Sequence, residues 1–168
     1  WLVLQLTGRG VDLGVLSAIS FGPVLAAGAW AGALLDRVDH RRALIVTQLS
    51  FIVVASALWA LTATGAATLW EVFALAFVSG CVFAVDSPAR QVYVLELVGP
   101  ERTASAVGLF EVIINASRVI GPATSGVLIA TAGVSTCFAV NALSFVPPLY
   151  VLLRFRPDHR ERPRTASR

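Results

Sequence analysis

The chain has 168 residues, of which 57% are hydrophobic and 14% charged, with a mean hydropathy of +0.78 and a formal net charge of +3. A soluble domain of this size needs far more polar surface, so the composition excludes an ordinary soluble globular protein. A cleaved signal peptide would explain one long uncharged run but not several, such as Leu13–Leu35 and Ala43–Trp70. The sequence predicts an all-α, polytopic membrane protein.

Five complete transmembrane helices are expected, since a run of roughly 20 apolar residues crosses the hydrocarbon core as a helix. The opening WLVLQL is too short to span and is interpreted as the end of another, truncated helix. The last segment, 154–168, is interpreted as an arginine-rich linker. The predicted spans are about 13–35, 43–63, 69–86, 104–128 and 134–153.

Ionisable residues crowd into the break between the first two spans. Six of the seven residues from Asp36 to Arg42 can carry a charge, and no charge follows until Glu71. The next hydrophilic stretch begins at Asp86, so a loop is expected over 86–103. Glu71 itself is interpreted as an interfacial residue near the end of its span.

Arginines orient the predicted topology. All 13 basic residues are arginine, and 11 of them fall on one side of the spans, against Arg9 on the other side and Arg118 within a span. By the positive-inside rule, the charged break, the 86–103 segment and the 154–168 tail are expected to be cytoplasmic. The excess of arginine on the cytoplasmic side accounts for the basic character of the chain, so no nucleic-acid partner is expected. The tail either contacts anionic lipid headgroups or is a solvated linker.

Catalytic motifs are absent from the sequence. Without a lysine there can be no Walker A phosphate loop, and no HExxH, GxSxG or CxxC motif occurs. His40 and His159 are interpreted as solvated loop residues, and Cys81 and Cys137 as small packing residues. The chain is therefore not expected to be an enzyme or to hold a metal or cofactor.

The fourth predicted span carries unusual polar residues. Glu111, Asn115 and Arg118 are spaced i, i+4 and i+7, which places them on one helical face. Each charge at the membrane centre costs about 2.5–3.5 kcal/mol on insertion scales, so both should avoid lipid. We expect them to line a water-filled substrate or proton pathway, or to face one another. A polar clasp that only holds helices together stays open as an alternative.

Small residues form a second pattern. Gly28 and Gly32 make a GxxxG in the first full span, and Gly121 and Gly126 surround Pro122 in the fourth. Such residues let helix backbones approach closely, and ordinary helix packing is their default interpretation.

These positions carry a resemblance to a known family. The segment GALLDRVDHRR resembles the loop between the second and third helices of the major facilitator superfamily, with Asp39 in place of the inner glycine of that motif. The residues that match the loop motif are Gly32, Asp36, Arg37, Arg41 and Arg42.

The fourth span resembles the exporter motif of the superfamily's fifth helix. Gly108, Gly121, Pro122 and Gly126 match it, whereas serines at 117 and 125 stand in for two glycines. Together with DSPARQ and FAVNALSFV, the pattern is similar to the branch that contains macrolide efflux proteins and the enterobactin exporter.

The resemblance implies the first half of a twelve-helix carrier, from the end of helix 1 through helix 6. Its expected partners are the lipid bilayer of a bacterial inner membrane and a second six-helix half. In this family the charged loop acts as a latch between inward- and outward-open states. Asp36 with Arg37 or Arg41 would do this here, with Asp86 as a candidate partner; a purely topogenic loop is the alternative.

The resemblance thus leads to a functional hypothesis. We expect proton-coupled efflux of a small, drug-like molecule by alternating access. Glu111 would titrate or recognise a cation, Arg118 would hold its charge state or a substrate anion, and Asn115 would donate a hydrogen bond. A siderophore or metabolite exporter on the same fold, and a channel or non-transporting subunit, remain alternatives.

Overall fold

The computed structural model describes residues 1–35, 38–99 and 103–154, without the side chains of 27–35. These residues form helices and no strand, which confirms the predicted all-α fold class. In chain order the helices are α1 (Leu2–Thr7), α2 (Gly10–Leu35), α3 (His40–Ala63), α4 (Leu69–Val98), α5 (Thr103–Ser144) and α6 (Val146–Arg154).

Three helical runs in the described part of the chain are long and apolar enough to cross a bilayer. They are His40–Ala63, Leu69–Val98 and the continuous stretch Thr103–Arg154; the described apolar part of α2, Gly10–Ala26, is shorter. A chain with several such runs is a multi-pass membrane protein, because each run must pair all its backbone groups internally within lipid.

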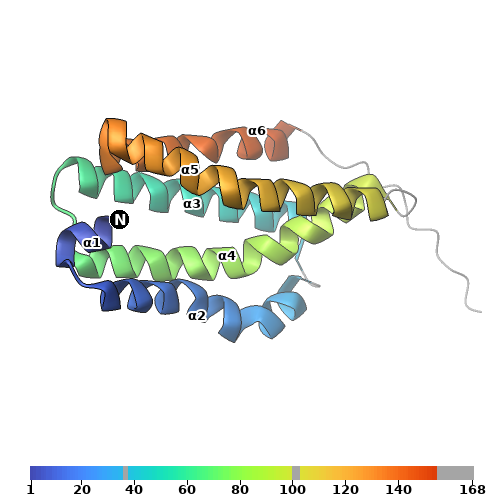
Figure 1. Cartoon of the computed structure of the whole chain (residues 1–168). Coiled ribbons are helices and arrows are strands. Elements are labelled where there is room, and N and C mark those ends of the chain that lie inside the picture. The colour runs from blue at the N-terminus through green and yellow to red at the C-terminus, as the bar shows by residue number, and fades with distance from the viewer. Residues whose placement is uncertain (36–37, 100–102, 155–168) are drawn as a thin grey trace, which may run out of the picture.

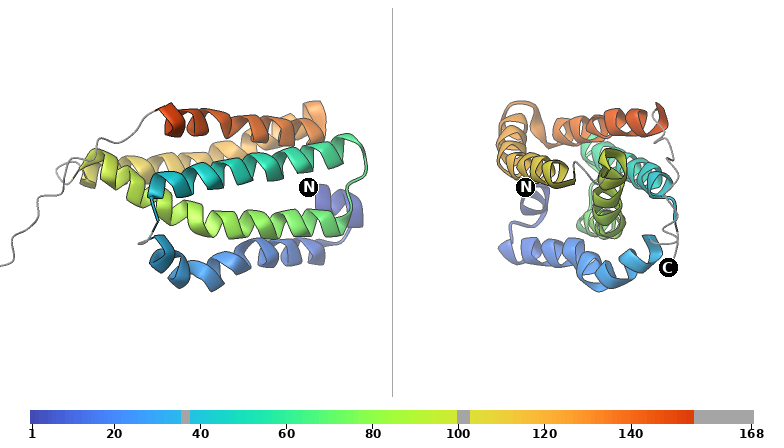
Figure 2. Two further views of the ribbon diagram at one scale, coloured as in Figure 1. Left: turned by 180° about the vertical axis from the view of Figure 1, so that it is seen from behind. Right: turned by 90° about the vertical axis from the view of Figure 1, so that its right-hand side faces the viewer.

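The long helices lie side by side in a layered bundle (Figure 1). Helix α4 packs against α2 on one side and against α3 on the other, and α5 and α6 both pack on α3. The view from behind in Figure 2 shows the same order, with α4 between α2 and α3. The short α1 contacts α2 and α4 at the end where α4 begins.

Helix α5 reverses direction at Gly133. Its backbone there has φ 82°, in the region where glycine meets no Cβ penalty. The chain folds back into a second arm, which is interrupted once more at Phe145, just before Pro147 and Pro148. The Phe145 ring stacks on Phe51 of α3 with centroids 5.1 Å apart and planes 14° apart. This stack holds the interruption against α3.

Helix α3 begins inside the charged segment. Asp39 is its N-cap, and its side chain accepts a hydrogen bond from the Arg42 backbone N–H at 3.0 Å. Aspartate is among the best N-cap residues, because it satisfies an orphan N–H of the first turn. The expectation that His40 is a solvated loop residue was wrong: it is the first residue of α3 and is only partly exposed.

Helix α4 continues well past its expected end. The prediction of a loop over 86–103 was wrong, because α4 is helical to Val98. Asp86 and Arg90 are spaced i, i+4 and pair with each other, so their charges are neutralised on the helix. The helix ends at Gly99, where φ is 75°.

Glu71 has a structural role at the start of α4. The Thr68 hydroxyl accepts from the Glu71 backbone N–H, while a Glu71 carboxylate oxygen accepts from the Thr68 backbone N–H at 2.9 Å. This capping box satisfies two backbone donors at once.

Two apolar clusters hold the bundle together, one near each end. The cluster near the start of α3 is built on Leu44, Ala89, Tyr93 and Leu152. The cluster at the opposite end is built on Val3, Val72 and Phe73. The first cluster joins α3, α4 and α6, so these three helices form one packed unit near the start of α3.

Helices α2 and α4 make a close backbone contact at Gly80. A Cβ added to Gly80 would overlap the Ser20 carbonyl oxygen and lie 3.3 Å from the Pro23 ring. A glycine at such a crossing lets two helix backbones touch. The contact of α2 with α4 therefore requires the absence of a side chain at this position.

Candidate functional site

A buried carboxylate lies between α3 and α4. Asp86 is 3% exposed. One of its oxygens accepts from the Thr47 hydroxyl at 2.6 Å and from the Gln48 side-chain amide at 3.1 Å. The other accepts from Arg90 Nη2 at 2.7 Å and Nε at 3.2 Å. Four donors thus converge on one carboxylate.

This network explains how a charge is tolerated inside the bundle. A buried carboxylate is costly unless it is paired and its lone pairs are satisfied, and a two-pronged arginine pair does both. Gln48 is 1% exposed, and its Oε1 has no hydrogen-bond partner among the described residues. On α3, the Thr47 hydroxyl and the Gln48 side-chain amide both donate to Asp86.

Arg41 contacts the last turn of α6. Its guanidinium donates to the Leu152 carbonyl at 2.8 Å and to the Leu153 carbonyl at 3.1 Å. These carbonyls belong to the last turn of α6, where backbone acceptors lack helical partners and a positive charge is favoured. In the described structure the partners of Asp86 come from α3 and α4, and Arg41 is not among them. Asp36 and Arg37 lie outside the described residues.

The start of α3 also contacts the end of α4. The His40 imidazole Nδ1 lies 3.2 Å from a Glu96 carboxylate oxygen, a contact that is an ion pair only when the imidazole is protonated. Sequence reasoning missed this contact because Glu96 was expected in a loop. Arg41 and His40 together tie the first turn of α3 to the ends of α6 and α4.

The polar face of α5 is exposed along its length. Glu111, Asn115 and Arg118 are all exposed, and the Asn115 side-chain amide donates to the Glu111 backbone carbonyl at 2.9 Å. Within residues 103–154, no ion pair joins Glu111 to Arg118. The structure therefore does not bring these two charges together.

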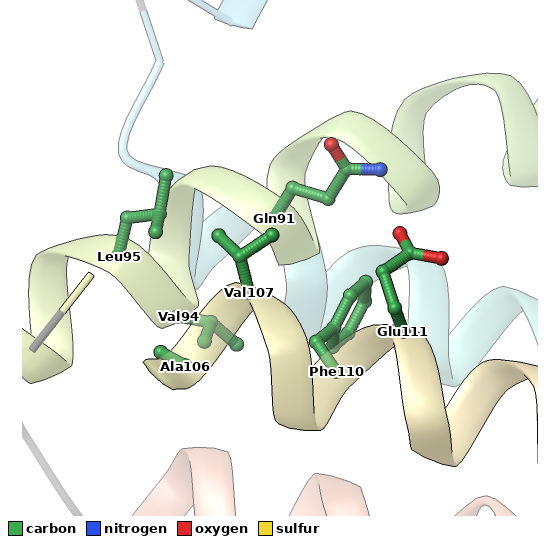
Figure 3. A pocket seen from close by; sticks show the side chains of 7 residues that line it. All are labelled: Gln91, Val94, Leu95, Ala106, Val107, Phe110 and Glu111. Carbon is green, nitrogen blue, oxygen red and sulfur yellow. The ribbon is translucent and has the colours of Figure 1, made fainter. Parts of the chain in front are cut away.

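Glu111 borders a small crevice between α4 and α5 (Figure 3). The crevice has a volume of about 70 Å³. The Gln91 amide and the Glu111 carboxylate point to the same side of it, and the Phe110 ring stands next to Glu111. The other lining residues are apolar: Val94, Leu95, Ala106 and Val107. Asn115 and Arg118 do not line this crevice.

The exporter-motif glycines of α5 face open space in this structure. A Cβ at Gly108, Gly121 or Gly126 would have no atom within 4 Å. Pro122 lies inside the same helix, and Gly32 of the loop motif lies near the end of α2. The described helices make no close approach at these three α5 positions, unlike at Gly80.

Several residues that build the site were not singled out from the sequence. Thr47, Gln48 and Gly80 look like ordinary polar or small residues of apolar runs, and Arg90 was placed in a loop. The one available signal was the adjacent polar pair Thr47–Gln48 in an otherwise apolar stretch. Among the described residues, no group of three or more potential ligands could hold a metal ion.

Comparisons with known proteins place this chain among membrane transporters. A family model described as "Transmembrane secretion effector" matches residues 1–167. The chain is 32% identical to the staphyloferrin A transporter of Staphylococcus aureus, over 100% of this chain and 43% of the relative. It is 27% identical to the multidrug efflux pump Tap of Mycobacterium tuberculosis, over 100% of this chain and 41% of the relative.

A more distant match extends the same picture. The chain is 24% identical to macrolide efflux protein A of Streptococcus pyogenes, over 83% of this chain and 35% of the relative. The chain thus spans less than half the length of these three relatives. No solved structure matches it at a significant level.

Proposed function

Because the chain belongs to the major facilitator superfamily, within its transmembrane secretion effector family, we propose that it forms one half of a secondary active exporter of small molecules. The carrier works by alternating access between two six-helix halves, with the substrate near the midplane. Its membrane is the bacterial inner membrane, with the start of α3 and the 154–168 tail on the cytoplasmic side.

One observation carries the proposal: Glu111 is an exposed carboxylate on an apolar helix and forms no ion pair within the described structure. An ionisable group in a transmembrane helix marks a substrate or ion path by default. Asp86 differs, because its charge is matched by Arg90. Glu111 is therefore the group we assign to proton or cation coupling, with Arg118 and Asn115 farther along the same helix.

The first test is energised efflux by the full-length protein in a pump-deficient bacterium loaded with a fluorescent cationic dye. Efflux that stops when a protonophore is added supports proton-driven export. Absence of efflux despite confirmed membrane expression contradicts export of cationic drugs.

Glu111→Gln tests the coupling role directly. We expect the variant to lose energised, pH-dependent efflux, because the amide cannot carry the proton. The matched control is Glu71→Gln, which also removes one carboxylate but keeps the capping box, since glutamine serves there too. Retained pH-dependent efflux in Glu111→Gln would remove this residue as the proton carrier.

The charged loop is proposed to act as a latch that sets the balance between the two open states. The contacts of the neighbouring His40 and Arg41 with the ends of α4 and α6 support a mechanical role for this segment. We expect Asp36→Asn to slow transport severalfold while substrate affinity stays unchanged. Transport rates and substrate binding are measured on the same preparation. If the normally expressed variant transports at the wild-type rate, the latch is excluded and the loop serves only to orient the helices in the membrane.

A siderophore exporter is the second candidate, favoured by the 32% identity to the staphyloferrin A transporter. Bacteria would then require the protein for growth under iron starvation rather than under drug exposure. A channel or non-transporting subunit is distinguished by the lack of transport against a gradient.

A further inference from the structure

The crevice between α4 and α5 has the chemistry of a cation site. We propose that it binds the protonated amine or quaternary ammonium head group of an amphiphilic substrate. This inference rests on the proposed function and adds to it a subsite and a substrate class. Three features of the crevice carry it: charge, an aromatic face and size.

Charge is the first feature. Glu111 is the one ionisable residue among the seven that line the crevice. The nearest arginine along α4, Arg90, already holds Asp86 in a two-pronged pair. On α5 the next cation is Arg118, seven residues away and so roughly 10 Å along the axis. A negative group with no close described cation attracts a positive ligand and repels an anionic one.

The second feature is the aromatic ring beside the carboxylate. Phe110 precedes Glu111, and both side chains border the same crevice (Figure 3). A cation over an aromatic face is attracted by the ring quadrupole, and aromatic residues are the usual partners of quaternary ammonium groups. The Gln91 side chain, on the opposite helix, supplies a polar group that can accept from an ammonium N–H.

Size limits the ligand to a head group. The crevice volume of about 70 Å³ is well below the roughly 300–1,000 Å³ of pockets that enclose drug-sized ligands. The body of a drug-sized molecule must therefore lie outside the crevice. Two apolar residues that line the crevice, Leu95 and Val107, are 36% and 46% exposed, so an apolar tail can lie against them.

The test measures equilibrium binding of benzyltrimethylammonium to the purified full-length protein in nanodiscs of phosphatidylglycerol, which offers no competing lipid amine. Neopentylbenzene, in which carbon replaces the charged nitrogen, is the matched neutral ligand. We expect Glu111→Gln to weaken binding of the cation at least about tenfold, and Phe110→Leu to weaken it about two- to fivefold. Neither variant should change binding of neopentylbenzene, and Glu71→Gln should change nothing.

Two results would overturn the site. Wild-type affinity of Glu111→Gln for the cation would exclude the carboxylate as its partner. An equal loss of both ligands in that variant would mean that the crevice had changed shape rather than lost a charge.

Uphill transport by the wild-type protein is measured in parallel, which separates this inference from the proposed function. Transport without Glu111-dependent cation binding refutes the subsite alone. Glu111-dependent binding without uphill transport refutes the carrier function and leaves the cation site standing.

Discussion

Gly80→Val should prevent α2 and α4 from packing together, and we expect this substitution to have the largest effect on folding. The first carbon of any side chain at position 80 overlaps the Ser20 carbonyl oxygen. A backbone carbonyl cannot rotate away as a flexible side chain can, so the helices must separate. Gly80→Ala should already cost about 1–3 kcal/mol, the usual range for overpacking, and valine more.

The loss of stability is measured as the change in the unfolding temperature in detergent, with size-exclusion chromatography as the assay of folded protein. Gly14→Ala is the matched control, because Gly14 lies on α2 and its Cβ would meet no atom within 4 Å. That variant should unfold at or slightly above the wild-type temperature, since alanine is the better helix former. A Gly80→Val protein that melts like the wild type would show that the two backbones do not touch here.

Asp86→Ala is expected to have the second-largest effect. The substitution leaves Thr47, Gln48 and Arg90 without their shared acceptor. Removing one partner of a buried ion pair typically costs about 3–5 kcal/mol. Arg90 is 38% exposed and can turn toward water, so we expect a loss at or below the lower end of that range, about 2–3 kcal/mol.

A double-variant cycle separates pairing from packing. The double variant Asp86→Ala/Arg90→Ala should lose less stability than the sum of the losses of the two single variants. In the double variant no charge is left unpaired, whereas each single variant leaves one. Asp86→Asn keeps an oxygen for Thr47 but loses the charge, so it should fall between wild type and alanine. Additive losses in the double variant would mean that the ion pair contributes nothing to stability.

Two faces of the second half of α4 are held in different ways. Near the start of α3, the buried carboxylate network, the Arg41 contacts and the apolar cluster unite α3, α4 and α6. Helix α5 packs mainly on α3 and touches α4 much less, which leaves the crevice at Glu111.

Composition and local pattern determined the fold class, and the resemblance of two motifs indicated the family. Long uncharged runs must be helices in lipid, because no other single segment pairs its own backbone groups. The turn near Gly133 was also readable, since small residues at 132–133 break an apolar run. The motif residues from Gly32 to Arg42 and from Gly108 to Gly126 identified the family because their spacing is local along the chain.

Tertiary structure decided which residues meet. Helix α4 extends to Val98, and Asp86 and Arg90 pair on it. A prediction that places every charged stretch in a loop misses both features. The partners of Arg41 lie 111 and 112 residues away in sequence, and Gly80 is set apart from other glycines only by the Ser20 carbonyl against it. Such contacts depend on how helices cross, and the crossing is a property of the packed bundle rather than of any one segment.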